Sequence, residues 1–220
     1  MYSALEKGFL GATNNARLKF SVMWCNHDLG SMAKNAERPE TFEQMTDYLI
    51  ENYFSNPSDW KIDGSPYFSI YDIRSFLETF GGDQIKAAAA LARFRNKVKA
   101  AGFPDLHLNA VLFGLGNNTD GSALAQELKI DSLTSYVWIH HKALPDFPET
   151  DYGKIANAYF RGVQQGGLAN GLKKPAAALG VPYHLNVSMG WDSSPRCRNA
   201  PDWMTRRGYP FVSVNLRRKK

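Results

Sequence analysis

Trp, Asn, His and Asp side chains stand together directly after an apolar stretch near the start of this sequence. The stretch begins at Phe20, and Trp24, Asn26, His27 and Asp28 follow or end it. A strand interior favours Val, Ile, Phe and Met and does not accommodate an ionised Asp, so a buried strand is expected to end here. His27 and Asp28 are candidates for a catalytic acid and base, and an ordinary loop with satisfied polar groups is the alternative.

Similar groups follow three later apolar stretches. They are Tyr71 with Asp72, His140 with His141, and Trp191 with Asp192 and Arg196. Aromatic rings can stack on the apolar faces of sugars, while Asp, Asn and Arg form hydrogen bonds with sugar hydroxyls. We therefore predict a rim that binds an oligo- or polysaccharide. Its expected members are Trp24, Asn26, Asp28, Tyr71, Asp72, His140, Trp191, Asp192 and Arg196.

Cleavage of a glycosidic bond generally requires two carboxyl groups, roughly 5 to 5.5 Å apart for retention or 6.5 to 9.5 Å for inversion. Asp28, Asp72 and Asp192 are available, but no two of them form an evident pair in the sequence. Each is expected to hold a hydroxyl rather than to act as the acid. The catalytic residues therefore stay unassigned.

Two other chemistries are alternatives to the carbohydrate interpretation. A metal-dependent hydrolase could use His27, His140 and His141, but there is no His-x-His pair on a predicted strand and no His-x-x-x-His on a predicted helix. A serine triad has less support, because no Gly-x-Ser-x-Gly elbow occurs. We expect neither a resident metal nor a cofactor.

The apolar stretches alternate with helical patterns along the chain. Strands are expected at 18–23, 67–71, 106–113, 134–139 and 182–188, with a weaker strand at 209–214. Helices are expected to begin near Thr41, Asp83, Ser122 and Asp151, and a turn is expected at Asp63-Gly64-Ser65-Pro66. This alternation predicts βαβ crossovers and a parallel sheet.

Polar residues follow nearly every predicted strand, which favours a barrel rim over the single crevice of a doubly wound sheet. The chain has no Gly-x-Gly-x-x-Gly or Gly-x-x-x-x-Gly-Lys motif, which weakens a nucleotide-binding alternative. Five to six strands are too few for closure. The fold class predicted is therefore α/β, as an incomplete (β/α)8 TIM barrel, with residues 1–220 forming a single partial domain truncated at both ends.

Composition narrows the class of protein further. Of the net charge of +5, four charges come from Arg217 to Lys220, so the rest of the chain is nearly neutral and a nucleic-acid partner is not expected. Cys25 and Cys197 are too few for a disulfide scaffold. No membrane span and no export signal are expected, and the compartment stays unassigned. Open parallel edges of an incomplete barrel predict poor solubility or dimerisation.

Three segments, taken together, resemble one known family. They are 22–28 (Val-Met-Trp-Cys-Asn-His-Asp), 64–72 (Gly-Ser-Pro-Tyr-Phe-Ser-Ile-Tyr-Asp) and 188–196 (Ser-Met-Gly-Trp-Asp-Ser-Ser-Pro-Arg). Their order and spacing resemble those of WbsX-type proteins, which are similar to glycoside hydrolase family 99 and occur in bacterial polysaccharide gene clusters. The resemblance implies a (β/α)8 barrel that acts on glycosidic bonds of a polysaccharide, as a hydrolase or a glycosyltransferase. Family 99 proper contains endo-acting α-mannosidases.

The resemblance also implies site residues, with two departures from the family pattern. Trp24, Asn26, Tyr71, Asp72, Trp191, Asp192 and Arg196 match its pocket-lining positions. His27 stands where many relatives have Glu, and the Glu-Trp-x-Glu motif that supplies the family's catalytic carboxylates is absent. We therefore expect a fragment resembling strands three to seven, which binds sugar without the catalytic pair; a non-catalytic glycan-binding barrel is the alternative.

Overall fold

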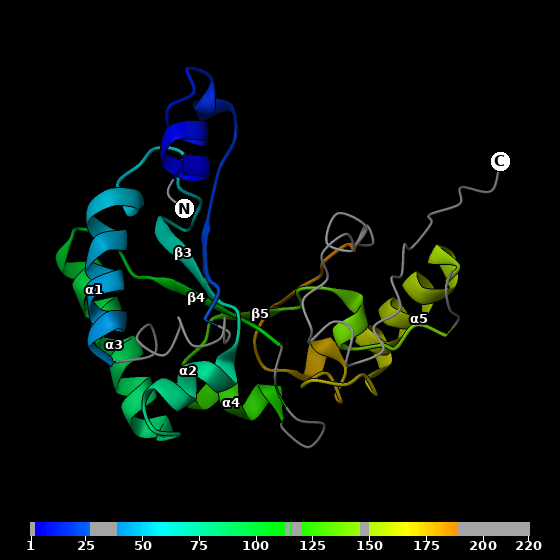
Figure 1. Cartoon of the computed structure of the whole chain (residues 1–220). Helices are drawn as coiled ribbons and strands as arrows, with labels where there is room; N and C mark the ends of the chain where they lie inside the picture. Colours follow the sequence, from blue (N-terminus) through cyan, green and yellow to red (C-terminus); the bar gives the residue numbers. More distant parts are fainter. Residues whose placement is uncertain (1–2, 27–38, 113–114, 116–119, 146–149, 189–220) are drawn as a thin grey trace, which may run out of the picture.

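The computed structural model describes residues 3–26, 39–112, 115, 120–145 and 150–188. A six-stranded sheet organises this part of the chain (Figure 1). Its strands are β1 (Val22–Trp24), β2 (Lys61–Ile62), β3 (Ser65–Ile70), β4 (His107–Val111), β5 (Ser132–Thr134) and β6 (Tyr183–His184).

The sheet is mostly parallel and its strands lie in the order β1-β3-β4-β5-β6. This spatial order follows the chain without a reversal, so the described strands contain no topological switch point. β2 alone pairs antiparallel, through a hairpin whose turn residues Asp63 and Gly64 both have positive φ. The prediction of a mixed α/β fold with a mostly parallel sheet is confirmed, and the arrangement is compatible with part of an α/β barrel.

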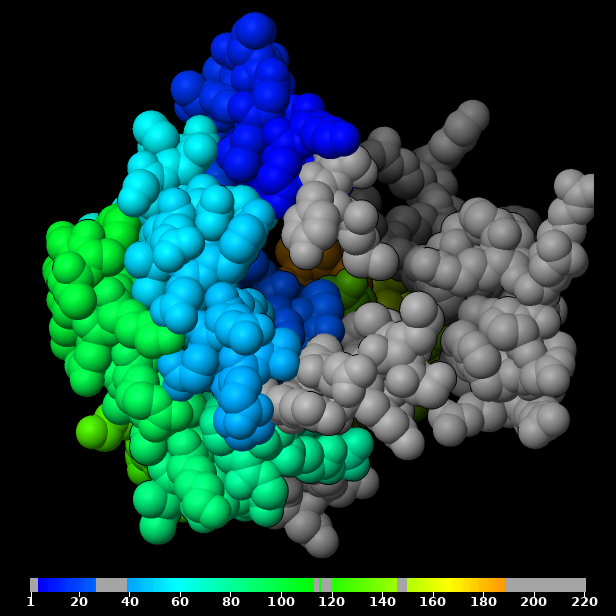
Figure 2. All heavy atoms as spheres, turned by 60° about the vertical axis from the view of Figure 1, so that its left-hand side comes forward, coloured from blue at the N-terminus to red at the C-terminus, as the bar shows by residue number. Residues whose placement is uncertain are grey.

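Helices connect the parallel strands. The α-helices are α1 (Pro39–Leu49), α2 (Ile73–Thr79), α3 (Gln84–Ala100), α4 (Gly121–Glu127) and α5 (Tyr152–Gln165). Shorter helical segments are η1 (Ser3–Phe9), η2 (Asn15–Arg17), η3 (Ile50–Phe54), η4 (Trp138–His140) and η5 (Ala176–Ala178). Atoms of α1 to α3 form a continuous cyan-to-green surface in Figure 2. An aspartate caps each of four α-helices, α2 to α5, by accepting main-chain N–H groups of the first turn.

The core lies between the sheet and these helices. Phe68 and Leu108 are adjacent in register on β3 and β4, and neither is exposed. The Phe68 ring meets that of Phe94 on α3 edge to face at 5.3 Å. Phe42 of α1 is also fully buried and contacts the same ring at 6.1 Å. This side of the sheet, called the helix face below, is therefore apolar.

Arg95 of α3 forms hydrogen bonds and ion pairs with the segments that lead into β4 and β5. Its guanidinium donates to the main-chain oxygens of Leu106 and Lys129, the latter at 2.8 Å. It also pairs with Asp131 at 2.6 Å and with Asp105 at 3.3 Å. Because the Arg95 side chain is only 15% exposed, these contacts are more shielded from water than an ordinary surface ion pair.

The prediction of a strand at 134–139 is wrong. β5 ends at Thr134, and Trp138 begins the 3-10 segment η4. The Trp138 ring packs against Tyr159 of α5 at 5.5 Å, and its main-chain N–H donates to the Ser188 hydroxyl at 3.0 Å. Trp138 thus packs on a helix and forms a hydrogen bond with a side chain. It does not take part in the β-ladder that the apolar composition of 134–139 predicted.

Two further strands are shorter than predicted, and one lies beyond the described part. β6 comprises only two residues of the predicted 182–188 segment. β1 starts later than the predicted 18–23 strand, and Phe20 forms an isolated bridge with Asp59 instead. The predicted strand 209–214 lies outside the described residues.

Asp59 is a buried carboxylate beside the first residues of the sheet. Its side chain is not exposed, and its Oδ2 pairs with Lys61 Nζ at 3.0 Å. Among the described residues its Oδ1 has no hydrogen-bond partner. Burial raises the Asp59 pKa to about 6, against the opposing effect of Lys61.

Replacing Asp59 by Asn should therefore change how stability depends on pH. The folded-state pKa lies above that of the unfolded chain, so Asp59 favours folding below about pH 4 and this contribution is lost as the pH rises through about 6. A shift of about 2 pKa units corresponds to roughly 3 kcal/mol. In urea unfolding, Asp59→Asn should gain about this much relative to wild type between pH 4 and pH 8. Asp63→Asn, in the neighbouring exposed turn, is the matched control; a pH-independent difference for Asp59→Asn would contradict the prediction.

Candidate functional site

The side of the sheet opposite the helix face carries a hydrogen-bonded row of polar side chains. Ser69, Asn109 and Ser132 occupy matching positions on β3, β4 and β5. The Ser69 hydroxyl donates to Asn109 Oδ1 at 2.8 Å, and Asn109 Nδ2 donates to Ser132 Oγ at 2.9 Å. All three side chains are buried and form hydrogen bonds with one another. This polar row therefore has a structural role in the sheet, and we do not assign it to ligand binding.

Aromatic side chains continue this polar face toward the amino ends of the strands. The rings of Trp60 and Tyr67 lie 4.8 Å apart, and Tyr67 stacks on His107 at 5.5 Å. His107 Nε2 lies 2.8 Å from Ser132 Oγ. Burial lowers the pKa of His107, which favours the neutral ring.

The carboxyl ends of β1 and β3 are joined by Asn26 and Asp72, two predicted sugar-binding residues. Asn26 Nδ2 donates to the Asp72 main-chain oxygen at 2.6 Å, and the Asp72 N–H donates to Asn26 Oδ1 at 2.8 Å. The Asp72 carboxylate accepts the N–H groups of Arg74 and Ser75 and so caps α2. Both residues are buried, and in this structure both position the rim through the main chain.

Trp24, also predicted to bind sugar, packs into the aromatic part of the core. Its ring centroid lies 5.4 Å from that of Phe42 and 6.2 Å from that of Phe76. Trp24 is partly buried and lies on the helix face of β1. The contacts described thus assign it to packing between the sheet and the helices.

Tyr71 and His140 are brought together by a third residue, Tyr136, which the strand prediction had placed inside a sheet. Tyr136 meets Tyr71 edge to face at 4.9 Å and stacks on His140 at 6.2 Å. These three residues form the rim cluster, at the carboxyl ends of β3 and β5. Tyr136 is 51% exposed, whereas Tyr71 is buried. The cluster therefore presents one accessible aromatic ring on a supported base.

Two members of the rim cluster, Tyr71 and His140, are uncharged near pH 7. Burial, followed by the nearby groups Tyr136, Cys25 and Asp72, raises the Tyr71 pKa to about 12. Burial and the neighbouring His141 lower the His140 pKa to about 4. A neutral phenol and a neutral imidazole can each donate and accept hydrogen bonds, as hydroxyl-rich ligands require.

His141 points into a different environment from His140. Its Nε2 lies 2.6 Å from Ser135 Oγ and its Nδ1 lies 2.9 Å from the Ala169 main-chain oxygen. Both ring nitrogens are therefore engaged by the protein. This geometry argues against His141 as a metal ligand in the alternative that used His27, His140 and His141.

The described part of the chain also bears on metal binding and membrane association. No three His, Cys, Asp or Glu side chains gather there in a way that could hold a metal ion. None of the helices described is both long and apolar enough to cross a bilayer. His27, Asp28, Trp191, Asp192 and Arg196 lie outside the described residues, so their predicted roles stay predictions.

Sequence reasoning missed α2 and Tyr136 for identifiable reasons. Ile73, Phe76, Leu77 and Phe80 have the helical spacing that could have revealed α2 and a capping role for Asp72. Tyr136 was hidden by the extension of the strand past Thr134. The alternation of polar and apolar residues on β3 and β4 could have shown which residues lie on each face of the sheet.

Comparison with known proteins adds no relative. The chain matches no protein-family model, no curated protein and no solved structure.

Proposed function

We propose that this chain is part of an α/β barrel that binds an oligo- or polysaccharide at the carboxyl edge of its sheet. The observation that carries the proposal is the exposed ring of Tyr136, held against Tyr71 and His140. An exposed ring on a fixed base offers a flat apolar surface for a sugar face, at little cost in side-chain entropy. Parallel strands that follow the chain order supply an edge where such residues gather.

Neighbouring groups fit a neutral, hydroxyl-rich ligand. Tyr71 and His140 are both uncharged near pH 7, so neither favours an anion or a cation there. Asn26 and Asp72 hold the adjacent strand ends in place through main-chain bonds. Their role in the proposal is to position the rim cluster, while Tyr136 makes the stacking contact.

Binding is proposed rather than cleavage. Among the described residues that directly follow the parallel strands, the carboxylate present is Asp72, and it is buried and caps α2. Glycosidic cleavage generally requires two carboxyl groups that face the bond. The resemblance to WbsX-type and family 99 proteins supports a polysaccharide ligand. If the chain also performs their chemistry, Asp28 and Asp192 are its candidate carboxylates outside the described part.

Replacing Tyr136 by Ala should weaken polysaccharide binding about tenfold, equivalent to about 1.4 kcal/mol. The physical reason is the loss of the exposed ring, which contributes little to the buried core. Affinity electrophoresis of the full chain in gels containing α-mannan, dextran or xylan measures the change. The resemblance makes α-mannan the first polysaccharide to test.

Tyr48→Ala is the matched control, because Tyr48 is 43% exposed on α1 and lies outside the rim cluster. It should migrate like wild type in every gel. Equal retardation of Tyr136→Ala and wild type would show that the rim cluster is not the site of polysaccharide binding. No retardation of wild type by any of the three polysaccharides would count against glycan binding itself.

A further inference from the structure

A second group of reactive side chains lies near the carboxyl end of β5 and is distinct from the rim cluster. Ser135, the residue after β5, hydrogen-bonds to His141 Nε2 at 2.6 Å. The opposite ring nitrogen lies 2.9 Å from the Ala169 oxygen, and Ala169 N–H donates back to the His141 oxygen at 3.2 Å. The imidazole is therefore held at both ends.

Donor and acceptor rules determine where the protons lie. A carbonyl oxygen only accepts, so His141 Nδ1 carries the hydrogen that Ala169 receives. Nε2 of a neutral ring is then an acceptor, and the Ser135 hydroxyl must donate to it. Burial lowers the pKa of His141, which keeps this ring neutral near pH 7. A serine that donates to an oriented, neutral histidine has the geometry of an activated nucleophile.

Two tyrosines complete the arrangement. Ser135 Oγ also hydrogen-bonds to the Tyr183 hydroxyl, and because the serine proton is committed to His141, Tyr183 must be the donor. The Tyr159 hydroxyl lies 2.7 Å behind that of Tyr183. In this structure the Tyr183 hydroxyl therefore holds Ser135 Oγ in place, and the Tyr183 side chain covers it.

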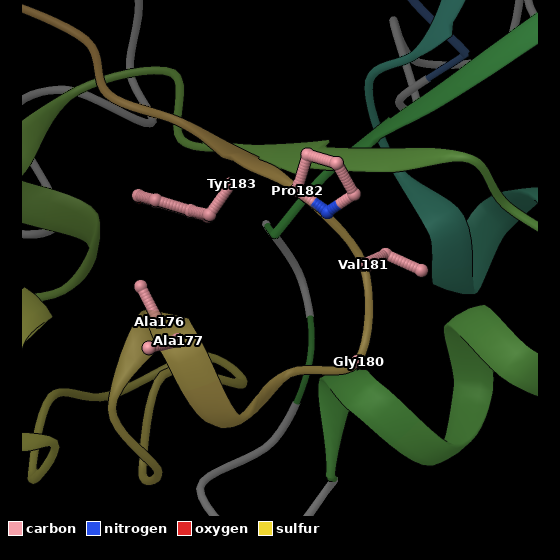
Figure 3. Close-up of a pocket in the computed structure, with 6 residues that line it drawn as sticks. All are labelled: Ala176, Ala177, Gly180, Val181, Pro182 and Tyr183. Carbon is pink, nitrogen blue, oxygen red and sulfur yellow. The ribbon is translucent and has the colours of Figure 1, made fainter.

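Tyr183 also lines a pocket of about 420 Å³. Figure 3 shows its side chain extending from β6 over Ala176 and Ala177 of η5. Gly180, Val181 and Pro182 form the rest of the lining, so none of the lining side chains is charged. The lining offers main-chain and hydroxyl polar atoms beside its apolar side chains, so it suits a small neutral group that has both apolar and hydrogen-bonding parts.

We propose that Ser135 is an acyl-accepting nucleophile, with His141 as its general base, for a short-chain carboxylic ester that enters at the Tyr183 pocket. The pocket lining selects the acyl group. Ser135 is only 3% exposed, and Tyr183 touches both the pocket and Ser135. The ester therefore reaches Ser135 when the Tyr183 ring turns aside, and the wild-type reaction is slow.

The reaction balances without a cofactor. Ser135 Oγ forms a bond to the ester carbonyl carbon while its proton passes to His141 Nε2. The bond from that carbon to the alcohol oxygen then breaks, and the alcohol leaves with the proton from His141. Water next attacks the acyl-serine and gives a proton to His141; the carboxylic acid leaves as Ser135 recovers its proton.

An alkyl fluorophosphonate probe tests the proposal on the full chain, with peptide mass spectrometry to locate the adduct. We expect a slow adduct on Ser135, formed at least tenfold faster in Tyr183→Ala, where the covering side chain is absent. Ser135→Ala should abolish it, and His141→Gln should slow it about a hundredfold or more. Ser132→Ala is the matched control, because Ser132 also contacts a histidine but lies apart from the pocket; it should label like wild type.

The pH profile provides a readout that a purely structural serine would not show. Because the His141 pKa lies below its ordinary value, the labelling rate should be flat between pH 7 and pH 9 and fall only in more acidic solution. Hydrolysis of p-nitrophenyl butyrate should follow the same order of variants. Absence of a Ser135 adduct in both wild type and folded Tyr183→Ala would overturn the proposal, as would a rate that climbs steadily with pH up to 9.

Discussion

Replacing Phe42 by Ala is expected to lower the free energy of unfolding by about 3 to 5 kcal/mol. Phe42 is fully buried on α1 and its ring contacts four aromatic neighbours, Trp24, Phe76, Phe80 and Phe94, at 5.4 to 6.1 Å. Removal of the ring leaves a cavity between α1, α2 and α3 that rigid aromatic neighbours fill poorly. Urea unfolding of the full chain, followed by tryptophan fluorescence and circular dichroism, measures the loss.

The control for Phe42→Ala is Ile85→Ala. Ile85 is 83% exposed on α3, so its truncation should change the free energy of unfolding by no more than about 0.5 kcal/mol. Phe42→Leu should recover part of the loss because it refills some of the space. If Phe42→Ala unfolded at the same urea concentration as Ile85→Ala, this result would contradict the packing of Phe42 in the core described above.

Replacing Arg95 by Ala is the second change with a large expected effect, a destabilisation of about 3 kcal/mol. The substitution removes donors from the main-chain oxygens of Leu106 and Lys129 and separates the guanidinium from Asp105 and Asp131. Equilibrium unfolding measures the total. Hydrogen exchange should also increase at the start of β4, where the Leu108 N–H donates to Asp131 Oδ2 at 2.7 Å.

Arg95→Lys separates geometry from charge. A single ammonium cannot reach two carbonyls and two carboxylates at once, so it should recover less than half of the loss. Lys86→Ala is the control, because Lys86 pairs with Asp83 at 3.4 Å on the surface and such pairs contribute about 0 to 1 kcal/mol. Equal effects of Arg95→Ala and Lys86→Ala would show that Arg95 is no more than a surface charge.

The sequence predicted much of the fold because strong local signals agree with tertiary packing. Asp83 and Asp151 cap the two longest of the α-helices described, as predicted. Of the turn predicted at Asp63-Gly64-Ser65-Pro66, the first two residues form the turn with positive φ, whereas Ser65 and Pro66 belong to β3. Strand ends were predicted less well. Trp138 is apolar enough for a strand, but its contact with α5 is a long-range interaction that local propensity does not encode.

The candidate site was predicted only in part. Tyr71 and His140 were identified because they follow apolar stretches, and the structure brings them together through Tyr136. Asp72 showed the same pattern for another reason, since a residue that caps a helix after a strand looks like a polar strand end. Ser135 and His141 have no sequence motif, because the bond that joins them depends on a turn and on the distant carbonyl of Ala169.

The buried polar row on the sheet also determines which alignment of the strands is possible. A slip of β4 by one residue would place Leu108 opposite Ser69 and leave the Asn109 amide among the apolar side chains of the helix face. An unsatisfied buried amide costs about 1 to 3 kcal/mol, and the slip would leave Ser69 and Ser132 without their partner as well. Hydrophobic burial alone still allows a slip by two residues, which keeps each side chain on its own face. The hydrogen bonds among Ser69, Asn109 and Ser132 would be broken by that slip as well, so they favour the observed register over it.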